Sequence, residues 1–178
     1  MTTGHIFIAQ SLDGYIARPD HSLDWLMKQT TEGEDHGYDD FIATVDGIVM
    51  GRGSFLNALT FDTWPYDIPV IVLSKTLRDK DVPAALTDKV ILSQLPPRDL
   101  MGMLADLGWQ RAYIDGGKVV QSFLREGLIN DIILTQIPIL IGRGIRLFGD
   151  LNQDIDMKHL GTKSFASGLV TSFYKLRA

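Results

Sequence analysis

Residues 47–55 read Gly-Ile-Val-Met-Gly-Arg-Gly-Ser-Phe, and this stretch decides the fold class. A short apolar strand, residues 48–50, runs into Gly51, Arg52 and Ser54 before apolar residues resume. That order places a glycine, a cation and a hydroxyl where a strand ends and a helix begins. The start of a helix offers free backbone N–H groups and a partial positive charge, and arginine adds a planar fork that matches phosphate oxygens. The stretch therefore predicts a strand–turn–helix unit with a phosphate site at its turn.

Two further loops carry similar chemistry. Asp115-Gly116-Gly117-Lys118 follows the apolar strand 112–114, and its glycine pair allows the backbone to approach a pyrophosphate closely. Ser74-Lys75-Thr76 follows the strand 69–73 and offers a cation and two hydroxyls. Taken singly, each loop is also explained by turn glycines and solvated cations. Because all three loops follow strand ends, they can meet at one edge of a parallel sheet, which favours a dinucleotide with a 2′-phosphate, such as NADP.

Over most of the chain, segments with the apolar pattern of a strand are followed by segments with the apolar pattern of a helix. Strands are expected at 5–10, 47–50, 69–73, 90–92, 112–114 and 129–137, and helices at 38–46, 52–59, 100–107 and 119–124. Residues 18–37 are polar and irregular. The strands 158–164 and 169–176 follow each other without a helix, which predicts an antiparallel C-terminal edge. The pattern predicts one α/β domain over residues 1–178, with a mostly parallel sheet of about eight strands covered by helices on both faces.

The composition excludes several classes of protein. The chain has 178 residues, a net charge of −5 and no cysteine, which excludes disulfides, thiolate nucleophiles and cysteine-based zinc sites. The four histidines are scattered, so no metal site is expected. The acidic balance argues against a nucleic-acid partner, and the longest apolar run, residues 132–141, is too short and too interrupted for a membrane span. The N-terminus does not read as a signal peptide, so a cytoplasmic enzyme or binding protein is expected.

Three side chains are candidates for contact with a substrate. Asp13 follows the first strand, where a carboxylate can anchor a polar heterocycle or relay a proton; an ordinary Asp-Gly turn is the alternative. Trp25 either covers a ring-shaped substrate or fills the core. Arg143, between Gly142 and Gly144, either lines the mouth of the substrate site or is a surface cation.

Several motifs resemble those of one superfamily. The chain is similar to the dihydrofolate reductase superfamily, and more closely to the reductase domain of the bifunctional deaminase–reductase of bacterial riboflavin biosynthesis. The motifs that carry the resemblance cover nearly the whole chain in order: Ser11–Gly14, Val49–Arg52 with Ser54-Phe55, Leu73–Lys75, Tyr113–Gly117, and Pro138–Gly142 through Leu147-Phe148.

The resemblance implies a fold, a cofactor and roles for individual residues. The fold is a dihydrofolate reductase-like three-layer α/β/α domain, and the cofactor is NADPH. Gly51 belongs to the segment that grips NADPH, and Arg52, Ser54, Ser74 and Lys75 face the adenosine ribose phosphate. Gly116, Gly117 and Lys118 hold the pyrophosphate region, and Asp13 contacts the substrate. Reductases of this type tend to be homodimers.

Two departures bear on the substrate. Dihydrofolate reductases carry an acid on the helix shortly after their tryptophan, whereas residues 26–31 after Trp25 contain none. The zinc-binding deaminase half is also absent from this sequence. The chain is therefore expected to be an NADPH-dependent reductase that passes a hydride to a C=N or C=O group. Its expected substrate is an aminopyrimidine ribose phosphate, as in 5-amino-6-(5-phosphoribosylamino)uracil reduction, or a pterin-like heterocycle. A non-catalytic nucleotide-binding module and a true dihydrofolate reductase are the alternatives.

Overall fold

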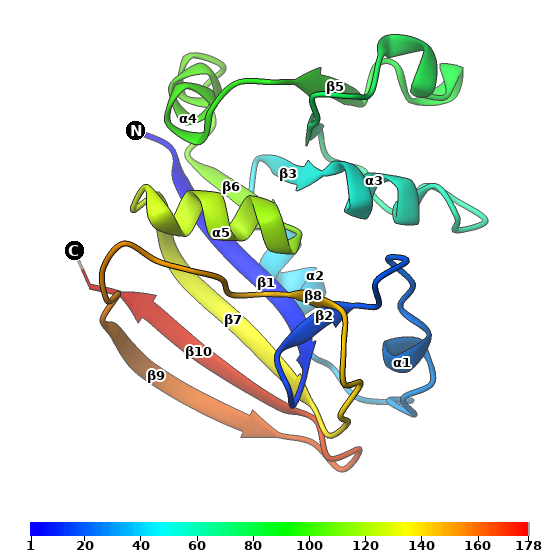
Figure 1. Cartoon of the computed structure of the whole chain (residues 1–178), viewed down its shortest axis with the longest axis vertical. Helices are drawn as coiled ribbons and strands as arrows, with labels where there is room; N and C mark the ends of the chain where they lie inside the picture. The colour runs from blue at the N-terminus through cyan, green and yellow to red at the C-terminus, as the bar shows by residue number, and fades with distance from the viewer. Residues whose placement is uncertain (178) are drawn as a thin grey trace.

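Eight strands form the main sheet of the computed structural model, which describes residues 1–177. Their bounds are β1 Thr3–Ser11, β3 Gly47–Gly51, β4 Val70–Leu73, β5 Val90–Ser93, β6 Arg111–Asp115, β7 Ile129–Ile137, β9 Met157–Ser164 and β10 Val170–Leu176. The order across the sheet is β5-β4-β3-β6-β1-β7-β10-β9 (Figure 1). The first six strands in this order are parallel, and β10 is antiparallel to both β7 and β9. The expected parallel sheet with an antiparallel C-terminal edge is therefore confirmed.

Helices cover both faces of the parallel part of the sheet. Their bounds are α1 Asp24–Met27, α2 Tyr38–Ile42, α3 Arg52–Ala58, α4 Pro97–Asp106 and α5 Gly117–Arg125, with 3₁₀ turns at Asp79–Asp81 and Ala84–Leu86. Strand β3 shows how the layers form. Val49 joins the core under α4 and α5, whereas its neighbours Ile48 and Met50 join the core under α2 and α3. Because successive side chains of a strand point to opposite faces, an uninterrupted apolar strand needs a helical layer on each side.

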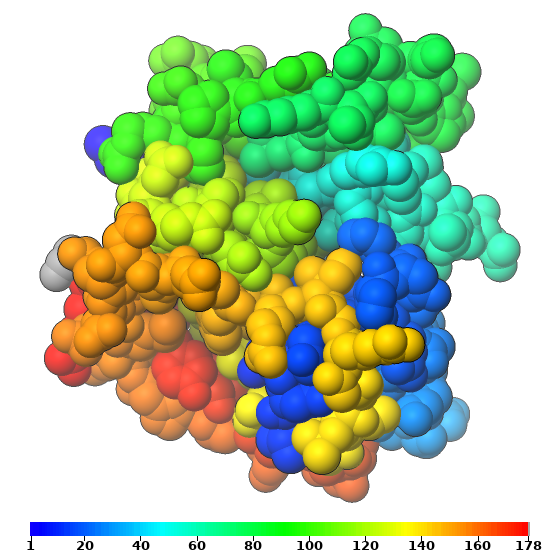
Figure 2. Space-filling model, viewed as in Figure 1, coloured from blue at the N-terminus to red at the C-terminus, as the bar shows by residue number. Residues whose placement is uncertain are grey.

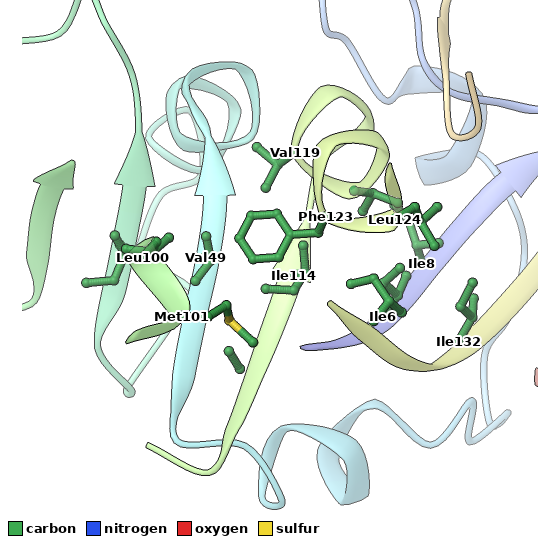
Figure 3. Close-up of a cluster of buried hydrophobic side chains, with 14 of the residues drawn as sticks. Ile6, Ile8, Val49, Leu100, Met101, Ile114, Val119, Phe123, Leu124 and Ile132 are labelled. Atoms are coloured by element: carbon green, nitrogen blue, oxygen red, sulfur yellow. The ribbon is translucent and has the colours of Figure 1, made fainter. Parts of the chain in front are cut away.

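Helix α5 fixes the position of the Gly116-Gly117 turn. Its apolar residues Val119, Phe123 and Leu124 pack on Ile114 of β6 and on strand β1 (Figure 3). Phe123 is fully buried. Since α5 begins directly after β6, this packing holds the turn at the carboxyl end of β6.

The structure also differs from the sequence expectations in three places. Residues 18–37 contain the four-residue helix α1, and the helix expected over 38–46 ends at Ile42. A separate two-stranded ribbon, β2 Tyr15–Ala17 with β8 Ile145–Arg146, was not expected as a pair. These elements are too short to show a periodic pattern, because a strand of two residues cannot alternate. Among residues 1–177, no helix is long and apolar enough to cross a membrane.

Candidate functional site

The carboxyl ends of the parallel strands bring the candidate loops to one edge of the sheet. Strands β4, β3, β6, β1 and β7 are consecutive neighbours, and each of them runs into a loop that the sequence singled out. Ligands of open α/β sheets bind at this edge, where helices start and strand order reverses. Here the chain passes from β1 outward to β3 and later returns to place β6 between them. The edge therefore has the geometry of a ligand site.

Gly116 and Ser54 bring two of these loops into contact. A Cβ atom on residue 116 would lie 2.9 Å from Ser54 Oγ and 3.8 Å from the backbone nitrogen of Gly51. Gly116 has a φ of 88°, a conformation that side chains disfavour. The loops after β3 and β6 thus meet, as the sequence predicted.

The structure gives a reason for glycine at position 117 that differs from the close approach of a pyrophosphate suggested by the sequence. The residue is buried, and a Cβ atom there would lie 2.5 Å from the carbonyl oxygen of Arg146 and 3.0 Å from Ile145 Cγ2. The absent side chain therefore makes room for strand β8. Close approach of a pyrophosphate to Gly117 stays a prediction from the resemblance.

The loops after β3 and β4 border a polar hollow. It has a volume of about 430 Å³ and is lined by Arg52, Leu56, Thr76, Leu77 and Asp81. Lys75 is exposed on the same loop as Thr76. Arg52 and Lys75 are therefore available to a phosphate outside the protein core.

Ser74 has a local role within its loop. It is only 9% exposed, and its Oγ accepts hydrogen bonds from the backbone N–H groups of Thr76 and Leu77 at 3.2 and 3.1 Å. These bonds shape the turn that presents Lys75. Direct contact between Ser74 and a phosphate stays a prediction.

His21 is a residue at this edge that the sequence reasoning treated as structural. Its ring contacts Gly53 so closely that a Cβ atom on Gly53 would collide with Nδ1. Figure 2 shows the segment after β2 against the start of α3. Among residues 1–177, His21 is the only non-glycine residue with a positive φ, 70°. The glycine at 53 next to Arg52 is the signal for such a close approach, but the sequence does not name its partner.

Asp13 joins the turn after β1 to the loop after β7. Its carboxylate accepts a hydrogen bond from the Ser11 hydroxyl at 2.5 Å and one from the backbone N–H of Gly142 at 2.7 Å. A longer bond comes from the N–H of Ile141 at 3.2 Å. The Ser11 hydroxyl, and to a smaller extent these two N–H groups, lower the pKa of Asp13. The side chain is thus ionised at neutral pH, which suits an anchor and makes it a poor proton donor.

Asp115 is an acid in this region whose pKa is raised, in contrast to the lowered pKa of Asp13. It ends β6, directly before Gly116, and burial raises the pKa of its carboxyl group. The neighbouring Ser54 hydroxyl, Gly116 N–H and Tyr113 side chain favour the ionised form and oppose that shift without cancelling it. A carboxyl that keeps its proton to higher pH at a strand end is a candidate general acid. The sequence analysis quoted Asp115 only as part of a glycine turn, and an Asp-Gly-Gly sequence carries no signal of burial.

Trp25 and Arg143 occupy different environments. Trp25 is fully buried with Ile137 and Leu169, so in this structure the indole fills the core and does not cover a substrate. The interpretation of Trp25 as a lid is corrected accordingly. Arg143 is exposed in the loop that Asp13 holds, where its backbone N–H donates to the Ile141 carbonyl oxygen. A role for its side chain toward substrate stays a prediction. Within residues 1–177, no group of His, Asp or Glu side chains is arranged to bind a metal ion.

Comparison with known proteins identifies the family. The family model for the RibD C-terminal domain matches residues 3–171, and the chain belongs to this family. The uncharacterized protein YwjB of Bacillus subtilis is 34% identical over 167 residues, which cover 92% of each chain. A putative riboflavin biosynthesis protein from Shewanella sp. PV-4 is 37% identical, with a TM-score of 0.91 over 99% of this chain and 100% of that one.

More distant structures share the fold. A diaminohydroxyphosphoribosylaminopyrimidine deaminase/5-amino-6-(5-phosphoribosylamino)uracil reductase from Thermotoga maritima has a TM-score of 0.75 at 14% identity. The match covers 99% of this chain and 57% of that protein. Dihydrofolate reductase from Enterococcus faecalis has a TM-score of 0.64 at 12% identity, over 99% and 97% of the two chains. The dihydrofolate reductase-like fold that the resemblance implied is therefore confirmed.

Proposed function

We propose that this chain is an NADPH-dependent reductase of a small heterocyclic substrate. The observation that carries the proposal is the junction of Asp115, Ser54 and Gly116. There, two segments that the sequence predicts to bind phosphate groups meet beside a carboxyl group with a raised pKa. Membership of the RibD C-terminal domain family supports a reductase. A role in riboflavin synthesis, a cytoplasmic location and a homodimer are predictions drawn from the resemblance and the composition.

The residues at the edge of the sheet fit the parts of NADPH. Arg52 and Lys75 are exposed cations beside the hollow at the ends of β3 and β4, which suits the 2′-phosphate that distinguishes NADPH from NADH. Gly116 directly precedes α5, and the exposed Lys118 follows in the first turn of that nine-residue helix. A helix start and a nearby cation suit the pyrophosphate.

The two aspartates have separate roles in the proposed reaction. When bound, NADPH supplies a hydride to the carbon of a C=N or C=O group. The electron pair of that double bond then moves to the nitrogen or oxygen, which takes a proton from the Asp115 carboxyl group, and water returns the proton to Asp115. Asp13 remains ionised and holds the loop after β7 in place, so that the substrate is oriented between fixed walls.

A dihydrofolate reductase proper is not favoured by the geometry. The acid on α1, Asp24, is exposed and forms a bidentate ion pair with Arg18. It is therefore engaged at the surface and is not available to bind a pterin ring in a pocket.

The test is turnover by the purified protein. The protein is incubated with NADPH and either an aminopyrimidine ribosylamine or a dihydropterin, and oxidation of NADPH is followed by absorbance together with analysis of the product. Stoichiometric formation of NADP⁺ and reduced substrate is the expected result. Tight binding of NADPH without turnover of either class would favour the non-catalytic nucleotide-binding module instead.

A further inference from the structure

The polar hollow beside α3 has walls from three segments of the chain. Helix α3 contributes Arg52 and Leu56, the loop after β4 contributes Thr76 and Leu77, and the following 3₁₀ turn contributes Asp81. Its volume of about 430 Å³ lies within the range of sites that bind small molecules. The phosphate contact proposed above uses only the Arg52 wall of this hollow.

Hydrogen bonds within the chain fix the wall that carries Asp81. The Arg78 guanidinium donates to the carbonyl oxygens of Lys75 and Leu77 at 3.2 and 3.0 Å. The backbone N–H of Arg78 donates to Asp81 Oδ2 at 2.8 Å, whereas Asp81 Oδ1 has no hydrogen-bond partner in the described part of the chain. Because a carboxylate oxygen only accepts hydrogen bonds, this wall presents a fixed acceptor and suits a ligand with an N–H or O–H group there.

Arg52 and Asp81 give the hollow opposite charges at separate places. Both side chains are exposed, and within residues 1–177 neither of them belongs to an ion pair. A phosphate group is attracted to the guanidinium and repelled by the carboxylate. The anionic part of a ligand therefore lies at the Arg52 wall, and an uncharged part faces Asp81.

Two leucines supply the apolar surface of the hollow. Leu56 follows Arg52 by four residues, so both side chains lie on the same face of α3, and Leu56 is 40% exposed. Leu77 is almost completely buried and belongs to the core under α2 and α3. An exposed leucine near an acceptor suits a flat ring with apolar faces and a donor on its edge. Adenine is such a ring, and its 6-amino group is the donor.

We propose that Asp81 binds the 6-amino group of the adenine ring of the cofactor. The ring packs on Leu56, one N–H of the amino group donates to Asp81 Oδ1, and the 2′-phosphate lies against Arg52. This inference rests on the proposed function, because that function makes NADPH the ligand. It makes Asp81 a specificity-determining residue that favours adenine over hypoxanthine. In hypoxanthine a carbonyl oxygen replaces the amino group and meets the carboxylate with no proton to share.

Two pairs of probes test the recognition of the amino group. The purified protein is titrated calorimetrically with NADPH and its hypoxanthine analogue, and separately with adenosine 2′,5′-bisphosphate and inosine 2′,5′-bisphosphate. The adenine member of each pair is expected to bind about tenfold more tightly, the value of a hydrogen bond to a charged group.

The outcomes separate this inference from the proposed function. Equal binding within a pair that binds overturns the inference, and so does failure of all four probes to bind. A preference for the adenosine bisphosphate without binding of NADPH contradicts the proposed function and supports recognition of adenine. Binding of NADPH with the expected preference, but without turnover of any substrate, likewise contradicts only the reductase.

Asp81→Asn tests which side chain recognises the base. Asparagine can still accept the Arg78 N–H with its carbonyl oxygen, and it then presents an NH₂ donor in place of the acceptor. The variant is expected to lose the preference for adenine and to bind the hypoxanthine member of each pair at least as tightly. Asp79→Asn is the matched control, because Asp79 is exposed in the same 3₁₀ turn and does not line the hollow. A preference for adenine that persists in Asp81→Asn excludes contact between Asp81 and the base.

Leu56→Ala tests the packing of the ring. It should weaken both members of each pair alike, about fivefold, because it removes apolar surface that covers either ring. Leu107→Ala is the control, since Leu107 is 59% exposed directly after α4 and outside the hollow. Unchanged affinities of Leu56→Ala would show that the base does not lie on Leu56 and would overturn the proposed placement.

Discussion

Ser54 and Gly116 lie so close that a Cβ atom on residue 116 would be 2.9 Å from the Ser54 hydroxyl oxygen. Ser54 lies in the first turn of α3, directly after β3, and Gly116 directly follows β6; β3 and β6 are neighbouring parallel strands. Their contact joins the part of the edge that carries Arg52 to the part that carries Asp115. It therefore determines whether one extended ligand can reach both Arg52 and Asp115.

Replacement of Gly116 tests this contact. Gly116→Ala should lower the free energy of unfolding by about 1–3 kcal/mol, because the backbone conformation there is nearly restricted to glycine and the new methyl group meets Ser54. Gly102→Ala is the control. Gly102 lies within α4 with open space around it, so alanine should stabilise by about 0.5–1 kcal/mol. Denaturant unfolding measures both, and equal stability of Gly116→Ala and wild type would contradict the close approach.

Asp13 should make stability depend on pH. The folded protein holds this carboxyl at a pKa below its unfolded value, so its contribution is complete above the unfolded pKa and is lost as the pH falls through the folded pKa. Asp13→Asn is expected to be less stable than wild type at neutral pH, and the difference should shrink below about pH 4. Urea unfolding at a series of pH values measures this. A difference independent of pH would show that the charge of Asp13 does not hold the loop at Gly142.

Arg52 should distinguish the two nicotinamide cofactors. Arg52→Ala is expected to weaken NADPH binding about tenfold, the value of a charge-assisted hydrogen bond, and to leave NADH binding nearly unchanged. Arg98→Ala is a suitable control because Arg98 is exposed on α4 and pairs with Glu126. Equal losses for NADPH and NADH would exclude contact between Arg52 and the 2′-phosphate.

Asp115 should be required for turnover and not for cofactor binding. Asp115→Asn is expected to reduce kcat by roughly 10²–10⁴-fold while NADPH affinity is kept. In the wild type, kcat should fall as the pH rises through the raised pKa of Asp115, because the donor loses its proton. Ser54→Ala removes a hydroxyl that lowers this pKa, so the fall should move to higher pH. A pH profile unaffected by Ser54→Ala would contradict the assignment.

The architecture of the sheet could be read from the sequence because its elements are long or uniformly apolar. Strand β7 has the bounds that the pattern predicted, residues 129–137, and β3 is so completely buried that its apolar run needs no alternation. Elements that are too short to show a periodic apolar pattern were not predicted from the sequence. The two-residue strand β8 depends on Gly144 and Gly117, whose absent side chains admit neighbouring backbone.

The loops of the site could be located from the sequence, whereas their contacts could not. The Asp13 carboxylate meets the N–H of Gly142, which is 129 residues away in the chain, and no local pattern encodes such a partner. The raised pKa of Asp115 follows from its desolvation in the folded chain, which the local sequence does not encode. The role of Trp25 could not be decided from the sequence, since an aromatic residue in a polar stretch is equally consistent with a lid over a substrate and with a core residue.

The central claim is that the carboxyl edge of the sheet holds NADPH, and comparison of the two nicotinamide cofactors by calorimetric titration tests it most directly. The account predicts that NADPH binds at least about tenfold more tightly than NADH, with a stoichiometry of one per chain, because Arg52 and Lys75 meet the 2′-phosphate. Equal affinity for the two cofactors, or no binding of either, would contradict it.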